Sequence, residues 1–268
     1  MPRPRPFALA AFVVLFALAS PLAAQPVSLS PGPPSGERGF LPRYRFHLSA
    51  ESLVINDPRF DWDADFGGDL DLFDYGSGRL VGLANYEAML GDQLQLFDPN
   101  QGNYTLDLSL SYRLRATEFA AVFHHISRHL SDRPKRFPID WNMLGVRAAY
   151  GVSRGATHVQ LDGRALGTLA RSYVDYQGEL GVTASLQRDV RPRVTLVANA
   201  EAYVLLVDHA TSGRGSQNGG RVEGGLRVAG SKGVLELIAG WERRVDADAF
   251  QRLPESWGYF GFRLLSAN

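Results

Sequence analysis

The chain has 268 residues, no cysteine, and 28 basic against 28 acidic residues. Without cysteine it has no disulfide framework and no cysteine-ligated metal site. A net charge of zero argues against a nucleic-acid partner, which requires a basic face. The length suits a single domain. No motif in the sequence calls for a cofactor or a metal, and we expect neither.

The first 24 residues are predicted to be a cleaved secretory signal peptide. Arg3 and Arg5 precede an uncharged apolar stretch over residues 7–20, and small residues follow at 23–24. The stretch is too short for a spanning helix, which favours cleavage over an uncleaved anchor. Residues 25–40, which are rich in proline, are expected to form a disordered periplasmic lead-in.

Residues 41–268 consist mainly of segments in which apolar and polar residues alternate. In the segment 103–115, apolar side chains occupy the even positions from Tyr104 to Leu114, and polar ones the odd positions from Asp107 to Arg115. Because side chains in a strand point to alternate faces, such a segment has one apolar and one polar face. Twelve such runs are predicted, over residues 44–54, 62–73, 79–90, 103–115, 118–130, 141–152, 158–169, 174–187, 193–207, 219–229, 233–243 and 256–265.

The lengths of the connections suggest how these strands are arranged. Short joins at 74–78, 116–117, 153–157, 188–192 and 230–232 mostly alternate with long polar ones at 91–102, 131–140, 208–218 and 244–255. This asymmetry is typical of outer-membrane barrels, which have short periplasmic turns and long extracellular loops. We therefore predict an all-β fold, an antiparallel transmembrane β-barrel of about 12 strands in the bacterial outer membrane. Its partners would be outer-membrane lipid, lipopolysaccharide and the barrel insertion machinery.

Aromatic residues near the predicted strand ends are expected to form girdles at the membrane interfaces. The alternative is that they pack a soluble core. These residues are Trp62, Trp141, Tyr150, Tyr173, Trp241, Trp257 and Tyr259.

The densest group of polar residues lies at the predicted extracellular end of the fifth strand. His125, Ser127 and His129 share one face of that strand. A two-residue turn at 116–117 would pair Arg115 with Glu118 in the lumen and turn this face toward lipid. A histidine and a serine there could act as base and nucleophile on a lipid ester, with either histidine as the base. The alternative is a set of solvated side chains at a loop boundary. No catalytic acid is assigned, although Asp132 and Asp140 are near in sequence.

A row of aspartates follows one face of the second predicted strand. They are expected to form a lumen charge network with inward arginines, because buried charges need partners. An extended strand spreads such residues about 7 Å apart, so no metal site is expected from this row alone. The network comprises Asp63, Asp65, Asp69, Asp71, Arg113, Arg147 and Arg227, with Asp61, Arg164 and Arg221 as further candidates.

Two resemblances to families accompany these motifs. The stretch from Leu80 to Leu144, with its His125-Ile126-Ser127-Arg128-His129 core, resembles an uncharacterised family of bacterial outer-membrane barrels. That family has a His-x-Ser-Ser-His-Leu-Gly-Asp-Glu signature. The resemblance implies an outer-membrane barrel and no known activity. The same histidine and serine also look like part of the His-x-Ser-Asn motif of lipid A deacylases, although Arg128 replaces the motif's asparagine.

Three functions follow as hypotheses. The first is a non-enzymatic pore, scaffold or surface-interaction protein. The second is a hydrolase of outer-leaflet lipid esters, such as those of lipid A, that uses His125 and Ser127. The third is a soluble periplasmic binder of lipocalin type.

Overall fold

The computed structural model describes residues 31–131 and 137–266, so the predicted signal peptide and Asp132 lie outside the described residues. The predicted twelve strands are confirmed. Their bounds are β1 Gly39–Val54, β2 Trp62–Asp74, β3 Arg79–Gly91, β4 Asp98–Leu114, β5 Thr117–Leu130, β6 Ile139–Arg154, β7 Thr157–Ser172, β8 Tyr176–Arg191, β9 Val194–Val207, β10 Gln217–Ala229, β11 Gly233–Arg244 and β12 Glu255–Ser266.

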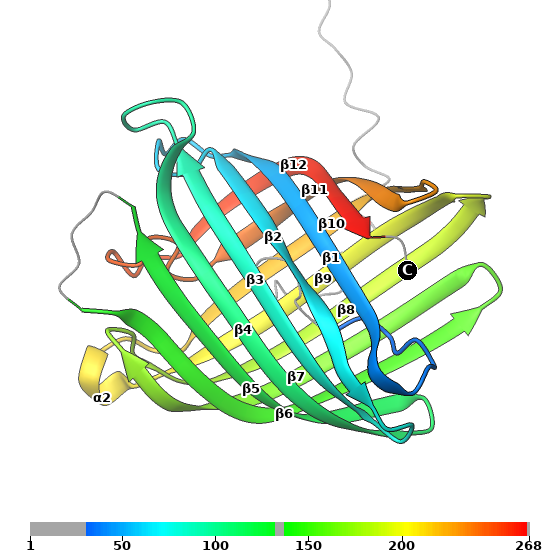
Figure 1. The fold of residues 1–268 in the computed structure, drawn as a ribbon. Coiled ribbons are helices and arrows are strands. Elements are labelled where there is room, and N and C mark those ends of the chain that lie inside the picture. The colour runs from blue at the N-terminus through cyan, green and yellow to red at the C-terminus, as the bar shows by residue number, and fades with distance from the viewer. Residues whose placement is uncertain (1–30, 132–136, 267–268) are drawn as a thin grey trace, which may run out of the picture.

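Each strand pairs with its neighbours in sequence, and β12 pairs with β1 to close the barrel (Figure 1). All of these pairs are antiparallel, as two-residue connections such as 155–156 and 192–193 allow. These two-residue connections lie at the same end of the barrel, which we call the short-turn end. The longer connections, including 92–97, 208–216 and 245–254, lie at the opposite, long-loop end. The short helix α2, His209–Ser212, belongs to one of them. Among the described residues, no helix has the length and apolar character needed to cross a membrane.

The two faces of the sheet differ in polarity as the alternation predicts. Leu108, Leu144 and Val182 point outward and are 47–57% exposed, whereas inward neighbours such as Ser109 and Arg147 are buried. Lipid contact favours an apolar exterior around a polar interior, the reverse of a soluble protein. The third hypothesis, a soluble binder, does not fit this arrangement.

The lumen near the long-loop end holds an apolar core, although a polar lumen was predicted. Three of the aromatics expected in the girdles, Trp141, Trp257 and Tyr259, point into this core and are at most 3% exposed, so that prediction was wrong for them. Alternation fixes which residues share a face, and these three fall on the inward face. The core includes Leu53, Phe60, Met89, Ile126, Trp141, Met143, Tyr176, Tyr203, Leu205, Val245, Trp257 and Tyr259.

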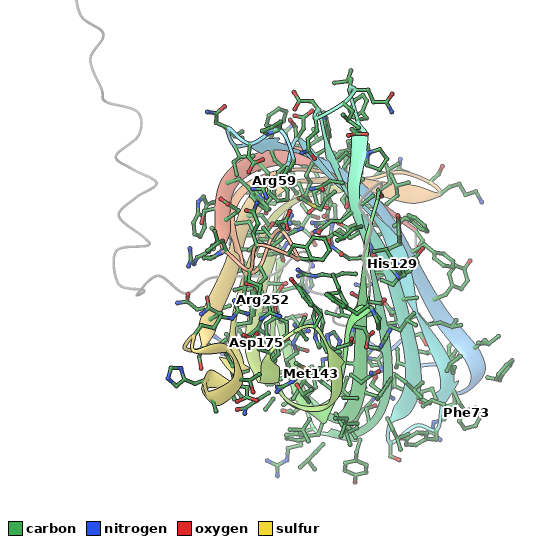
Figure 2. All side chains as sticks on the ribbon, turned by 90° about the vertical axis from the view of Figure 1, so that its left-hand side faces the viewer. Arg59, Phe73, His129, Met143, Asp175 and Arg252 are labelled. Atoms are coloured by element: carbon green, nitrogen blue, oxygen red, sulfur yellow. The ribbon has the colours of Figure 1, made fainter. Side chains whose placement is uncertain are left out.

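The connection between β11 and β12 closes the lumen at the long-loop end. Residues 245–249 are buried. Arg128 donates a hydrogen bond to the carbonyl oxygen of Asp246 at 2.5 Å, and Gln101 donates one to that of Ala247 at 3.1 Å. Buried side chains such as Met143 and the loop together pack this half of the barrel, which Figure 2 views from the long-loop end.

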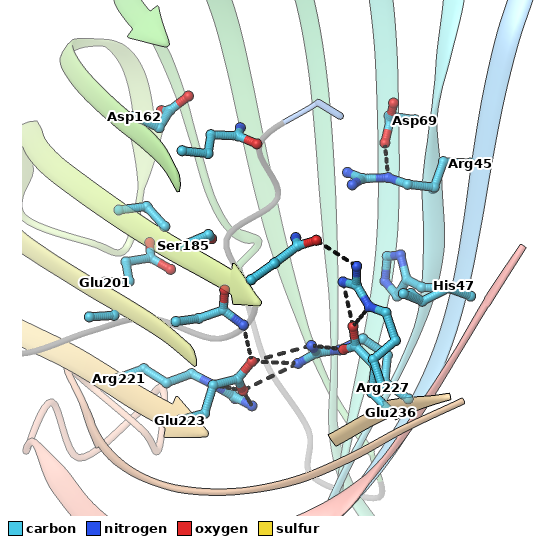
Figure 3. A pocket seen from close by; sticks show the side chains of 18 of the residues that line it. Arg45, His47, Asp69, Asp162, Ser185, Glu201, Arg221, Glu223, Arg227 and Glu236 are labelled. Carbon is cyan, nitrogen blue, oxygen red and sulfur yellow. Dashed lines mark hydrogen bonds and ion pairs between the residues drawn. The ribbon is translucent and has the colours of Figure 1, made fainter. Parts of the chain in front are cut away.

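The lumen near the short-turn end is polar and partly hollow. A cavity of about 170 Å³ lies between β7–β9 and the wall formed by β1, β10 and β12 (Figure 3). Part of the predicted lead-in also lies within the barrel, since Arg79 donates a hydrogen bond of 2.8 Å to the carbonyl oxygen of Gly32. The two halves of the lumen therefore differ in kind.

Candidate functional site

The structure places His125, Ser127 and His129 on the outward face of β5. Phe119 and Phe123, on the same face, are 47% and 38% exposed, whereas Ile126 on the opposite face is buried in the lumen. The predicted turn was displaced. Residues 115–116 form it, and Arg113 rather than Arg115 lies directly opposite Glu118 in the strand register. This shift of two residues leaves the faces of β5 unchanged, because the side-chain period is two.

Two hydrogen bonds link the polar side chains of this face. Ser127 Oγ lies 3.1 Å from His129 Nε2, and His125 Nδ1 lies 2.9 Å from Asn142 Oδ1. Asn142 is directly opposite His125 in the pairing of β5 with β6. The pairing of β6 with β7 shifts register between Asn142 and Met143. Such bulges often re-aim side chains beside active sites.

We call His125, Ser127, His129 and Asn142 the polar cluster. It lies on the outer face, on the long-loop side of a set of apolar side chains. Next to the row that holds His125 and Asn142, on the side toward the short-turn end, is a row formed by Leu108, Phe123 and Leu144. Strand spacing separates these rows by about 7 Å, or two residues. The cluster therefore borders directly on apolar side chains of the outer face.

A row of aromatic rings leads to the cluster around the outside of the barrel. Successive ring centroids are 5.3 Å apart for Phe66 and Tyr86, 4.8 Å for Tyr86 and Tyr104, and 5.2 Å for Tyr104 and His129. Aromatic rows of this kind occupy the interfaces of membrane barrels. Ser127 thus lies beside the end of this aromatic row, on the outer face of the barrel.

The contact with Asn142 orients the ring of His125. When Nδ1 donates to the side-chain oxygen of Asn142, Nε2 of a neutral imidazole is the nitrogen that can accept a proton. A histidine oriented in this way is the usual partner of a serine nucleophile. Asn142 is not predictable from the sequence, because the long connection 131–138 leaves the register between β5 and β6 undefined. Asp140, opposite Ser127 in that register, also faces outward.

The aspartates and arginines named for the lumen form ion pairs inside the barrel, with partners other than those expected. Asp69 and Asp71 pair with Arg43 on β1, and Asp63 pairs with Arg244 on β11 at 2.7 Å. Arg45 and Arg79 supply further contacts to Asp69 and Asp71. The predicted arginines also face the lumen and have other partners: Arg113 with Asp74, Arg147 with Asp162, Arg164 with Glu179, Arg221 with Glu51 and Glu223, and Arg227 with Glu236.

The loops at the long-loop end are joined by a second set of ion pairs. Arg214 contacts Asp175 and Asp246 at 2.7 Å each, and Tyr176 donates to Asp246 at 2.6 Å. Burial disfavours the charged form of Asp175, but the hydrogen bonds and charge of Arg214 outweigh it, so the pKa of Asp175 is lowered. We call Arg214, Asp175 and Asp246 the loop latch. Arg252 lies beside Asp175 at 3.7 Å (Figure 2).

Comparisons with known proteins assign the fold and no family. No protein-family model and no curated protein sequence matches the chain. The outer membrane phospholipase of Salmonella typhi matches with a TM-score of 0.51 at 10% identity, over 88% of this chain and 95% of that one. Outer membrane phospholipase A of Escherichia coli matches with a TM-score of 0.51 at 11% identity, over 86% and 98%. An active-site mutant of that enzyme, with asparagine changed to alanine, matches with the same TM-score and identity, over 86% and 92%.

At these identities the likeness concerns the fold alone. The chain has the closed twelve-stranded fold of bacterial outer-membrane β-barrel proteins. The resemblances noted for residues 80–144 stay predictions.

Proposed function

We propose that the protein resides in the bacterial outer membrane and hydrolyses acyl esters of outer-leaflet lipids. Ser127 is the nucleophile, His125 the general base, and Asn142 the residue that orients His125. The observation that carries the proposal is the His125–Asn142 hydrogen bond of 2.9 Å, on the outward face beside Ser127. A polar serine–histidine–asparagine group at the edge of a lipid-facing band has little structural reason to be there.

The reaction has two steps. Ser127 Oγ bonds to the ester carbonyl carbon while His125 Nε2 takes the hydroxyl proton. The ester C–O bond then breaks, and His125 gives the proton to the departing alcohol oxygen. Water, deprotonated by His125, attacks the acyl-serine. The C–Oγ bond breaks, Ser127 regains a proton, and a fatty acid leaves.

His129 has a different role in this scheme. Its Nε2 holds the Ser127 hydroxyl in the resting state, and its ring packs edge-on against Tyr104. The reaction therefore requires the Ser127 side chain to turn from His129 toward His125 when substrate binds, and such catalytic hydrogen bonds often form only in the substrate complex. We assign His129 the role of a positioning residue, so its removal should cost less activity than that of His125.

The fold likeness adds support of a limited kind. Barrels of this architecture include enzymes whose names describe lipid hydrolysis, and the active site of one contains an asparagine. The packed long-loop half of the lumen argues against the alternative of an open pore. A scaffold or surface-interaction role is the competing proposal.

The test uses the full-length protein, purified from the outer-membrane fraction and checked for heat-modifiable gel mobility. Micelles contain either an ester phospholipid or lipid A, and mass spectrometry identifies the released fatty acid, so the two arms distinguish the lipid class. Ser127→Ala and His125→Ala should each lower kcat/KM by about 10²–10⁴-fold, and Asn142→Ala by a smaller factor.

A matched control is available at the other end of the barrel. Ser153 Oγ lies 2.8 Å from His158 Nδ1 there, far from the proposed site. Ser153→Ala should therefore leave activity unchanged. Absence of fatty acid release in both arms, or full activity of Ser127→Ala, would reject the hydrolase and leave the scaffold role.

A further inference from the structure

Three carboxylates from neighbouring strands meet inside the lumen. Glu87 on β3 is directly opposite Asp65 on β2, and Asp63 is the next inward residue of β2. One oxygen of each carboxylate lies within 4.8 Å of one oxygen of each of the others, and all three residues are at most 5% exposed. The row on β2 alone is too extended for such a group, and the neighbouring strand completes it.

The charge around these carboxylates is incompletely balanced. The guanidinium of Arg244 contacts Asp63 at 2.7 Å, Glu87 at 2.9 Å and Glu242 at 2.7 Å. Among the described residues no cationic group lies within ion-pair distance of Asp65, whose side chain accepts a hydrogen bond of 2.6 Å from Asn85. Glu242 also has Arg221 at 3.6 Å. Among the described residues, Asp63, Asp65 and Glu87 therefore have one guanidinium between them, an arrangement that is costly without a further cation.

Three buried oxygens at this place have no hydrogen-bond partner in the described structure. They are Asp63 Oδ1, Asn103 Oδ1 and Glu87 Oε1, and the last of these forms an ion pair of 2.9 Å with Arg244. Asn103 is 7% exposed, lies directly opposite Glu87 in the pairing of β3 with β4, and donates a hydrogen bond to Glu87 through its amide nitrogen. Asp63 Oδ1 and the side-chain oxygen of Asn103 are therefore available to a ligand.

We propose that Asp63, Asp65, Glu87 and Asn103 bind a divalent cation of the calcium type. Carboxylate and amide carbonyl oxygens are the ligands that Ca²⁺ prefers, at about 2.3–2.6 Å. Two oxygens on one such ion lie at most about 5 Å apart, which agrees with the spacing of the carboxylates. The ion would join β2, β3 and β4 to one another and, through Arg244, to β11. This proposal is independent of the hydrolase.

The test uses luminescence of Tb³⁺, a probe for calcium sites. Trp257 packs on the guanidinium of Arg244, with 5.2 Å from Cζ to the ring, and so lies close enough to transfer excitation energy. We expect chelator-treated, detergent-folded protein to give saturable Tb³⁺ emission on tryptophan excitation, and Ca²⁺ to displace the probe. Asp65→Asn and Glu87→Gln should each weaken binding at least tenfold.

The control is Asp162→Asn, which changes another buried lumen aspartate, paired with Arg147 at 2.6 Å. It should bind Tb³⁺ like the unaltered protein. Heat-modifiable mobility shows that each variant is folded. A second measurement needs no variant: millimolar Ca²⁺ should raise the unfolding temperature relative to chelator. Unchanged affinity in Asp65→Asn and Glu87→Gln, or no emission and no change in unfolding temperature, would overturn the proposal.

Discussion

The two halves of the lumen differ in the side chains that fill them. Near the long-loop end, aromatic and aliphatic side chains pack against the inturned residues 245–249. Near the short-turn end, ion pairs such as Arg227–Glu236 line a cavity (Figure 3). A soluble protein has one apolar core surrounded by polar surface. This barrel instead has an apolar core above a polar chamber, with a second apolar surface on its exterior.

The packed half should contribute more to the free energy of unfolding, whereas the other half contains a cavity. Dispersion and hydrophobic contacts hold the long-loop half together. In the other half, charged pairs such as Arg227–Glu236 join side chains across the walls of a cavity. Mutations should therefore act unequally on the two halves.

The largest effect is expected for Trp141→Ala in the apolar half. Trp141 is 1% exposed and packs edge-on against Tyr176 at 5.1 Å. Its truncation leaves a cavity and should lower the free energy of unfolding by about 3–5 kcal/mol. Ser185→Ala, in the cavity wall, should change it by no more than about 0.5 kcal/mol. Urea unfolding in lipid vesicles measures both, and equal losses would remove the distinction between the halves.

A charge on the outer face should have the next largest effect. Leu108→Arg places a guanidinium in the apolar band and should cost about 2–4 kcal/mol near the midplane. Ser185→Arg is the matched change on the inward face, where Asp162 and Glu201 line the same cavity. It should be milder in the same unfolding assay. Comparable costs would mean that the faces are assigned incorrectly.

The loop latch offers a smaller effect at the boundary of the apolar half. Arg214→Ala leaves Asp175 and Asp246 without their shared guanidinium and should cost about 1–3 kcal/mol. It should also increase proteolytic cleavage within residues 245–254, since the loop loses its anchor. Arg191→Ala, at the exposed short-turn end, is the control and should leave both measurements unchanged. An uncleaved loop in Arg214→Ala would mean that packing alone holds it.

The smallest expected effect is a pH dependence of the same latch. The pKa of Asp175 is lowered in the folded protein, so its stabilisation is complete above the ordinary aspartate pKa of about 4. It is lost as the pH falls from that value through the lowered pKa of the folded state, because the unfolded state then takes up the proton first. Loop cleavage by an acid-tolerant protease should increase below about pH 4 and be flat from pH 5 to 8. Increased cleavage on the alkaline side would contradict this assignment.

The sequence predicts the faces of the strands far better than their neighbours across the sheet. Alternation alone places Leu108 outward and Ser109 inward, because it is a property of one segment. The contact between His125 and Asn142 depends on register across the connection 131–138, and no local pattern sets that register. The contact between Glu87 and Asp65 likewise depends on the register between two strands, β2 and β3. Alternation also cannot tell an inward aromatic that packs a core from an outward one in a girdle.

The four tryptophans of the chain fall into two separate environments. Trp141 and Trp257 are 1% exposed inside the barrel, whereas Trp241, on the outer face, is 41% exposed and Trp62 is half-buried. Brominated acyl chains quench indole fluorescence only on contact, so they should dim the outer pair and spare the inner one. The emission that survives would then report on the interior alone, and its recovery during refolding would time the filling of the barrel separately from its entry into the bilayer.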